Sequence, residues 1–320
     1  VSGTTLRYHL FSALDPSWPN APHLRWGGDT AQEDVVRWAF EAWKAIGIGL
    51  DFVEVDDPAD AEIRIGFAHG DGSWSYLGRQ ILDHGRPEQR TMNFGWDLTT
   101  NHGRDTALHE IGHTLGMPHE HQNPNAGIVW DEEAVLRHFA GPPNGWTPQV
   151  TRRNVIDKLD EHAVFGSEWD RDSVMHYSFA AGLIIEPPAL SRGLVPAPGL
   201  SGRDVAWVQA WYPPVEEDDL ARRDVNRSHP VQIVPGAQAH FEIAPTATRD
   251  YTVTTLGSAD TVLVLFEEID GEFRYVAGDD DSGDDRNARI VYHLIAGRRY
   301  VLRARLYYSA ASAEIGVVMF

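Results

Sequence analysis

The segment HEIGHTLGMPHEH, residues 109 to 121, is the feature that most constrains this chain. His109 and His113 are four residues apart, which on a helix places both imidazoles on one face, with Cβ atoms about 5 to 6 Å apart. A third histidine cannot continue the helix and still face the same ion. Gly116 can adopt the left-handed conformation that turns the chain back, so we expect His119 to reach the same point.

Composition limits what such a cluster can bind. The 320 residues include no cysteine and carry a formal net charge of -20. Thiolate ligands and disulfides are therefore absent, so a metal must be held by histidine, carboxylate or tyrosine. The acidic balance argues against a nucleic-acid or anionic-membrane partner, because both require a basic face. We expect neither of these partners, and we expect a monomer.

Three histidine ligands leave one position of a zinc ion open for a water, which is the arrangement of a catalytic site. Glu110 follows the first ligand, where a carboxylate can take the proton of that water and pass it to a leaving amine. The segment therefore predicts a zinc site for peptide hydrolysis. The alternative is a helix with surface histidines, which the extended spacing HExxHxxGxxH disfavours.

Local signals place this motif on a helix. Asp105 is the expected N-cap, and Gly116 followed by Pro118 is expected to end the helix. Gly112 inside the helix costs about 1 kcal/mol relative to alanine. Something other than helix propensity must therefore account for this glycine.

The region before the motif predicts a mixture of strands and helices. Residues 4 to 11 and 61 to 68 alternate as strands do, and residues 31 to 46 repeat apolar side chains at helical spacing after Asp29, a plausible N-cap. A strand, a helix and a strand in this order indicate an α/β arrangement that carries the motif helix.

A change of composition divides the chain. Two prolines and an acidic cluster, in WYPPVEEDDLARRD, follow the apolar helix expected over residues 204 to 212. We therefore expect a catalytic domain over residues 1 to 213, a linker over 214 to 227 and an accessory domain over 228 to 320. In the accessory domain, short β-rich runs separated by Gly, Asp and Pro turns predict an all-β sandwich.

A second motif, SVMHYSF at residues 173 to 179, supplies Met175 and Tyr177. Together with the histidine motif it resembles the astacin family of metzincin zinc metallopeptidases, in which HExxHxxGxxHE is joined to SxMHY. GSWSYLGR, residues 72 to 79, resembles the upper-rim segment of that family. The resemblance spans roughly residues 2 to 213. It implies an α+β metzincin catalytic domain, a twisted sheet plus a zinc-binding active-site helix, followed by the all-β sandwich.

The resemblance implies roles for the matched residues. Zinc would be held by His109, His113 and His119. Glu110 would be the base, and Tyr177 a displaceable fifth ligand that hydrogen-bonds the oxyanion in the transition state.

Other implied roles concern the surroundings of the metal. Met175 would form the turn beneath the ion. The rim would hold a protein or peptide substrate by strand addition, through Ser73, Trp74, Ser75 and Tyr76. In this family a buried mature N-terminus reaches the glutamate after the third histidine, here Glu120, and Val1 aligns too far along the first strand to do so. Either residues precede Val1 or Glu120 has another partner.

The tail, through DTVLVLFEE and AGDDDSGDDRNARIVYHLIAGRRYVLRAR, resembles the C-terminal domains attached to many secreted bacterial peptidases. Such domains often bind calcium, which prefers several hard oxygen ligands clustered on loops. The candidate ligands are Asp260, Asp279, Asp280 and Asp281. The alternative is a solvated acidic turn, and both interpretations remain open.

These observations predict a secreted bacterial zinc endopeptidase in its mature form, without signal peptide or propeptide, because no leader or membrane span is recognisable. The expected cofactors are zinc and, as a second candidate, calcium. One alternative is a catalytically silent metzincin-fold binding protein, which would have no need of Glu110. Another is a metzincin of matrixin type, which would lack the tyrosine ligand, here Tyr177.

Overall fold

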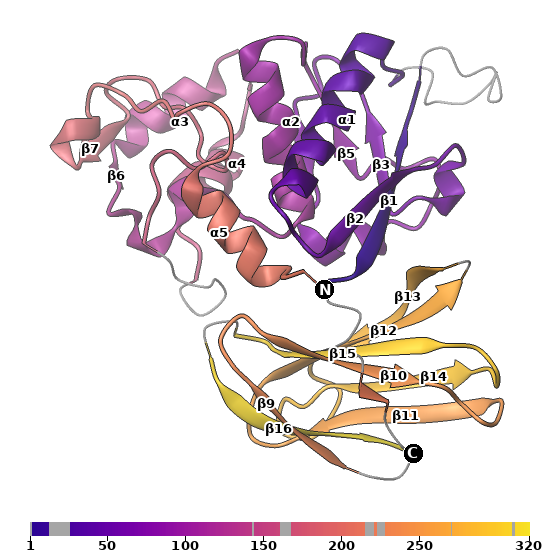
Figure 1. Cartoon of the computed structure of the whole chain (residues 1–320). Coiled ribbons are helices and arrows are strands. Elements are labelled where there is room, and N and C mark those ends of the chain that lie inside the picture. The colour runs from indigo at the N-terminus through magenta and orange to yellow at the C-terminus, as the bar shows by residue number, and fades with distance from the viewer. Residues whose placement is uncertain are drawn as a thin grey trace. The chain divides into compact units, whose positions relative to one another are not determined.

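The computed structural model describes residues 2–12, 26–142, 144–160, 168–214, 221–222, 228–269, 271–308 and 311–320. The chain divides into two compact units (Figure 1). The N-terminal unit comprises Leu6–Ile46 and Phe52–Ala206, and the C-terminal unit comprises Trp207–Phe320 with the short pieces Val1–Thr5 and Gly47–Asp51. The domain boundaries at residues 213 and 228 stay a prediction, and most of the expected linker lies outside the described residues.

A five-stranded sheet supports the histidine motif. Its strands, in spatial order, are β2 (Leu50–Glu54), β1 (Thr4–Leu10), β3 (Ile63–Gly66), β5 (Met92–Asn93) and β4 (Trp74–Ser75). Strands β1, β3 and β5 pair in parallel, whereas β4 pairs with β5 antiparallel and ends the order. The strands expected near β1 and β3 are confirmed. Strand β4 has one edge with which no other described strand pairs.

Two helices pack against each other beside this sheet, α1 (Thr30–Ala45) and α2 (Asn101–Thr114) (Figure 1). The cap predicted for α1 is confirmed, because the carboxylate of Asp29 accepts from the backbone N–H of Gln32 at 3.0 Å. Helix α2 carries the first two histidines of the motif and ends before Gly116, as expected.

The N-cap expected for α2 is wrong. Thr100 caps the helix, and its hydroxyl accepts from the backbone N–H of Gly103 at 3.0 Å, so α2 begins about one turn earlier than predicted. Asp105 instead accepts from the backbone N–H of Gly199 at 2.9 Å. Both threonine and aspartate are good cap residues. A partner 94 residues away engages the aspartate, which local sequence cannot show.

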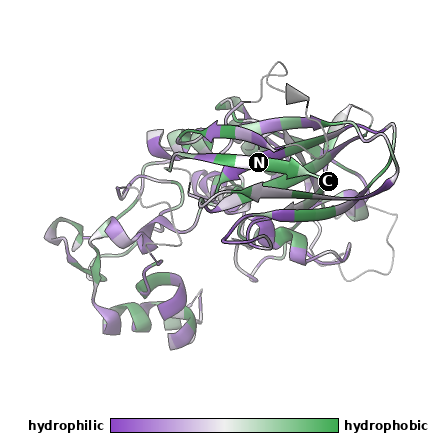
Figure 2. Ribbon diagram, turned by 90° about the horizontal axis from the view of Figure 1, so that it is seen from below, coloured by the Kyte–Doolittle hydropathy of each residue, from purple (hydrophilic) through white to green (hydrophobic). Residues whose placement is uncertain are grey.

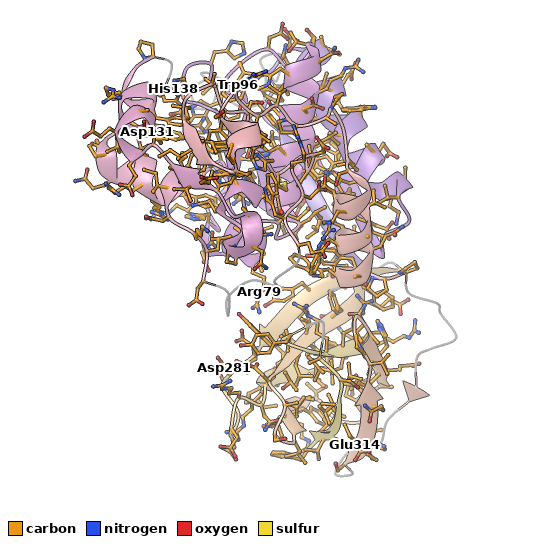
Figure 3. The ribbon with its side chains drawn as sticks, turned by 90° about the vertical axis from the view of Figure 1, so that its left-hand side faces the viewer. Arg79, Trp96, Asp131, His138, Asp281 and Glu314 are labelled. Atoms are coloured by element: carbon orange, nitrogen blue, oxygen red, sulfur yellow. The ribbon has the colours of Figure 1, made fainter. Side chains whose placement is uncertain are left out.

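A second apolar core lies within residues 126 to 194 of the N-terminal unit. Helix α3 (Glu132–Ala140), which the sequence analysis did not predict, is capped by Asp131 and buries Val135 and Phe139 in this core. Figure 3 labels Asp131 and His138, near the two ends of α3. The other elements are β6 (Val129–Trp130), α4 (Pro148–Thr151), the π-helical turn η6 (Arg152–Ile156), β7 (Ile184–Glu186), α5 (Gly202–Trp211) and the short 3₁₀ turns η2 (Pro58–Asp60), η3 (Gly78–Asp83), η4 (Glu120–Gln122), η5 (Pro124–Ala126) and η7 (Pro188–Leu190).

Apart from the end of α5 and the two short N-terminal pieces, the C-terminal unit is an all-β sandwich, as predicted. One sheet has the order β13 (Glu272–Asp279), β12 (Thr261–Ile269), β15 (Tyr300–Leu306), β10 (Gln238–Ile243) and β8 (Ala221–Arg222). The other has the order β14 (Arg289–Leu294), β11 (Arg249–Leu256), β16 (Ala313–Met319) and β9 (His229–Ile233).

The sandwich core follows from the alternation of side chains along each strand. In β14, Ile290 and Leu294 are buried, whereas Arg289, Val291 and His293 are exposed. Figure 2 shows hydrophobic and hydrophilic residues alternating along the strands.

Among the described helices of the whole chain, none combines the length and apolar character that crossing a membrane requires.

Candidate metal centre and active site

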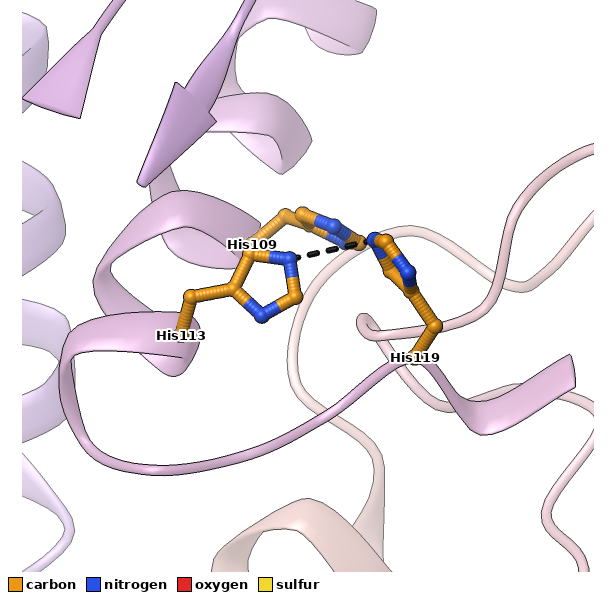
Figure 4. A group of neighbouring side chains, drawn as sticks. All are labelled: His109, His113 and His119. Carbon is orange, nitrogen blue, oxygen red and sulfur yellow. Dashed lines mark hydrogen bonds between the residues drawn. The ribbon is translucent and has the colours of Figure 1, made fainter. Parts of the chain in front are cut away.

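The three histidines of the motif converge, as their spacing predicts (Figure 4). Each contributes one ligand atom, and these atoms lie within 4.8 Å of one another; Nε2 of His113 is 3.1 Å from Nε2 of His119. In a tetrahedral zinc site with bond lengths of about 2.0 to 2.1 Å, ligand nitrogens are about 3.3 Å apart. Gly116 has a φ of 94°, so the expected left-handed turn delivers His119.

Every ligand ring is held through Nδ1 by an oxygen acceptor: His109 by the carbonyl of Val174 at 2.8 Å, His113 by the carbonyl of Met117 at 2.8 Å, and His119 by Oε1 of Gln122 at 3.4 Å. A carbonyl can only accept, so each Nδ1 carries the proton and each Nε2 keeps a free lone pair. This donor set fits a single zinc ion.

Burial keeps the ligand rings neutral. It lowers the pKa of His109 to about 4 and places the pKa values of His113 and His119 well below the usual value for histidine. Neutral imidazole is the form that binds a metal, and a ring that stays neutral at pH 7 releases no proton when it does so.

Glu110 lies beside the first ligand in a dry environment. Its side chain is buried, and burial alone raises the pKa of its carboxyl to about 8. Oxygen Oε2 is buried without a hydrogen-bond partner among the described residues. A buried carboxylate without a partner is costly, so such an atom indicates a site for a polar group that arrives with a ligand or water.

Tyr177 lies against the metal centre. Its ring centroid is 4.4 Å from that of His119 and 5.8 Å from that of His109. Burial, and then the charge of Glu110, raise the pKa of its hydroxyl, which therefore stays protonated. A protonated hydroxyl at this position can donate a hydrogen bond toward the centre.

Met175 lies beneath the motif helix and accounts for Gly112. A Cβ atom at Gly112 would lie 2.5 Å from Sδ of Met175, closer than non-bonded atoms approach. The Met175 side chain is 1% exposed, and its carbonyl accepts from the backbone N–H of Glu120 at 3.0 Å. Glycine at this position therefore allows the helix and the methionine turn to pack in contact.

Glu120 has partners within the described structure. Its Oε1 accepts from the backbone N–H of Asp170 at 2.8 Å and from Nδ2 of Asn123 at 3.0 Å. Burial nevertheless raises the pKa of this carboxyl to about 7, although both hydrogen bonds lower it. Glu120 therefore has hydrogen-bond partners both in its own turn and on the segment at Asp170.

The predicted rim residues lie on the edge strand β4 and its flanks. The hydroxyl of Ser73 accepts from the backbone N–H of Gly95 at 3.0 Å. Ser75 lies on the side of β4 that contacts α2, where its hydroxyl is 3.1 Å from that of Thr114. Trp74 and Tyr76 contact each other edge to face, with ring centroids 5.6 Å apart.

His121 and Gln122 are site residues that the sequence analysis missed. His121 is 1% exposed, stacks on His119 with centroids 5.1 Å apart and contacts Tyr177 at 4.6 Å. Its Nε2 donates to the carbonyl of Asn154 at 2.9 Å. The only local signal for these two residues is their position two and three residues after the third ligand.

The four aspartates proposed for calcium do not form a comparable centre. Within the described residues, the three histidines are the one group of three or more histidine, aspartate or glutamate side chains whose ligand atoms lie close enough together to hold an ion. Asp279 instead accepts hydrogen bonds from Ser282 and from the backbone of Arg289. Asp281, labelled in Figure 3, follows β13; burial, and then the charge of Asp281, raise the pKa of Asp260. Calcium binding stays a prediction.

The family match and the three-histidine centre together identify a metallopeptidase. The chain belongs to the astacin family, because the model of that peptidase family, described as "Astacin", matches residues 23 to 184, half of the chain. This membership decides against the matrixin type.

The chain is also similar to two known proteins. The solved structure of myroilysin is 29% identical, with a TM-score of 0.57, and covers 68% of this chain and 96% of that chain. Protein SpAN from Strongylocentrotus purpuratus is 24% identical over 221 residues, which is 65% of this chain and 33% of SpAN. The chain spans about a third or less of the length of the curated relatives it matches.

A further similarity to a solved structure is much weaker. The pre-peptidase C-terminal domain of a collagenase from Bacillus anthracis is 13% identical and covers 32% of this chain and 96% of that chain, with a TM-score of 0.28. Such a low score carries no functional assignment. The sandwich architecture rests on the two sheets described above.

Proposed function

We propose that this chain is a secreted zinc endopeptidase that cleaves peptide bonds in proteins or peptides. The observation that carries the proposal is the convergence of three neutral imidazoles beside the buried, unpartnered Oε2 of Glu110. His109, His113 and His119 would hold zinc through Nε2. When bound, zinc supplies a water of lowered pKa and polarises the substrate carbonyl.

Glu110 is the proposed base. Its Oε2 accepts a proton from the attacking water and then donates that proton to the leaving amine. A carboxyl whose pKa burial has raised toward neutrality can perform both transfers. The proximity of the metal would lower this pKa again and keep the carboxylate ionised before attack.

Tyr177 and the rim complete the proposed site. The tyrosine hydroxyl donates a hydrogen bond to the oxyanion, which exists only after attack, so it stabilises the transition state rather than the bound substrate. Residues 73 to 76 hold the substrate as an added strand, since β4 ends the sheet and one of its edges is not paired with a described strand. Met175 supports the centre from beneath.

The alternative is a protein that keeps the zinc fold but does not catalyse, with the sandwich as its working part. The Glu110→Gln variant separates the two functions. We expect it to retain zinc, measured by elemental analysis, and to hydrolyse a fluorescent casein substrate about 10²- to 10⁴-fold more slowly, because an amide cannot accept the proton.

The matched control is Glu62→Gln, which changes another carboxylate of raised pKa in the same unit. Glu62 accepts from the backbone N–H of Arg7 at 2.7 Å and lies outside the metal centre, so hydrolysis should persist. A parent protein that binds zinc but shows no chelator-sensitive hydrolysis would favour the binding protein.

A further inference from the structure

The three ligand rings are not held in the same way. His109 and His113 donate from Nδ1 to main-chain carbonyls, which no substitution removes. His119 faces a side chain, Oε1 of Gln122, at 3.4 Å. The orientation of the third ligand therefore depends on the identity of one residue.

The amide of Gln122 can face His119 in only one way. Its Nε2 donates to the carbonyls of Arg153 at 2.7 Å and Asp157 at 2.8 Å. An amide turned over would place its oxygen against these two carbonyl oxygens and lose both hydrogen bonds. Oε1 is thus the atom presented to His119, and it requires a proton on Nδ1 of that ring.

The acceptors of Gln122 belong to one platform, the π-helical turn Arg152–Ile156 together with its C-cap Asp157. The same segment accepts from Nε2 of His121 through the carbonyl of Asn154 at 2.9 Å. The carbonyl of Gln122 in turn accepts from the backbone N–H of Leu159 at 2.9 Å. π-Helical turns are frequent at functional sites. Here the main-chain carbonyls of the turn and its C-cap accept hydrogen bonds from His121 and Gln122, two and three positions after the metal ligand.

We propose that Gln122 is the positioning residue for the third metal ligand. Clamped by the turn at residues 152 to 157, it fixes the Nδ1-protonated tautomer and the ring orientation of His119, so that Nε2 points at the ion. This inference rests on the zinc site of the proposed function. Loss of such an outer partner typically weakens metal affinity by about 10- to 100-fold.

Two substitutions separate this role from a purely structural one. Gln122→Met and Gln122→Glu both lose the two donors to the turn, but only the methionine also loses the oxygen acceptor for His119. The measurement is the zinc dissociation constant of the full chain, obtained by competition with a chromophoric chelator. We expect about 10- to 100-fold weaker binding for Gln122→Met, and a clearly smaller loss for Gln122→Glu, which keeps the acceptor for His119 but loses the clamp.

A third variant controls for lost stability. Val155 is fully buried in the same turn, so Val155→Ala loosens the platform while it leaves the acceptor for His119 in place. Its zinc affinity should stay within about threefold of the parent, even though its melting temperature falls. This control keeps the test decisive if Gln122→Glu does not fold.

The inference is overturned if Gln122→Met binds zinc as tightly as the parent. It is also overturned if Gln122→Glu weakens zinc binding as much as Gln122→Met does. The same holds if Val155→Ala weakens zinc binding as much as Gln122→Met does, because zinc affinity would then follow the stability of the fold alone. A parent protein that binds no zinc would overturn the proposed function as well as this inference.

Discussion

Glu120 offers a test of the structure that does not depend on catalysis. Its side chain is half-buried between the methionine turn and the segment at Asp170, and its Oε1 accepts two hydrogen bonds. Glu120→Gln keeps an oxygen acceptor at this position and removes the charge. The substitution therefore isolates the cost of burying the ionised form.

The magnitude follows from the pKa. Burial raises it from the ordinary 4.5 to about 7, and each unit corresponds to about 1.4 kcal/mol. Because the folded-state pKa is raised, the contribution of this carboxyl to stability is present below about pH 4.5 and is lost as the pH rises through about 7. Relative to the parent, Glu120→Gln should gain about 2 to 3 kcal/mol of unfolding free energy between pH 5 and pH 8.

The assay is urea unfolding of the zinc-free chain at both pH values, followed by tryptophan fluorescence. Histidine titrations occur in both proteins and cancel in the difference. Glu133→Gln is the control, since that side chain is 88% exposed and should show no such gain. If the free-energy difference between Glu120→Gln and the parent is the same at pH 5 and pH 8, the carboxyl is not buried in the way described.

Three further outcomes are expected. Tyr177→Phe should lower kcat more than it raises KM in steady-state kinetics, and a change in KM alone would make the tyrosine a substrate-binding group. Gly112→Ala should lower the melting temperature, because displacing Met175 costs about 1 to 3 kcal/mol and exceeds the gain in helix propensity of about 1 kcal/mol. If calcium binds the acidic turn, millimolar calcium should raise the melting temperature of the parent above its value in EGTA, and Asp281→Ala should reduce this difference. Equal melting temperatures with calcium and with EGTA would mean that the acidic turn is a solvated loop.

Features encoded by short spacings could be predicted from the sequence. The helical repeat places His109 and His113 on one face, and a glycine at the left-handed position brings His119 back to them. The cap at Asp29 and the alternation of the sandwich strands are likewise local patterns. The role of Glu110 follows from its position directly after the first ligand, that of Tyr177 follows from resemblance to a family, and both remain proposals.

Tertiary structure decided the features whose partners are distant in the chain. Thr100 rather than Asp105 caps the motif helix, because Gly199 engages the aspartate. Met175 explains the helix glycine, and the turn that clamps Gln122 lies more than 30 residues beyond it. Spacing along the chain specifies which side chains share a face of one element. It does not specify which main-chain carbonyls of another element will lie opposite them, because only packing of the folded chain brings those groups within hydrogen-bond distance.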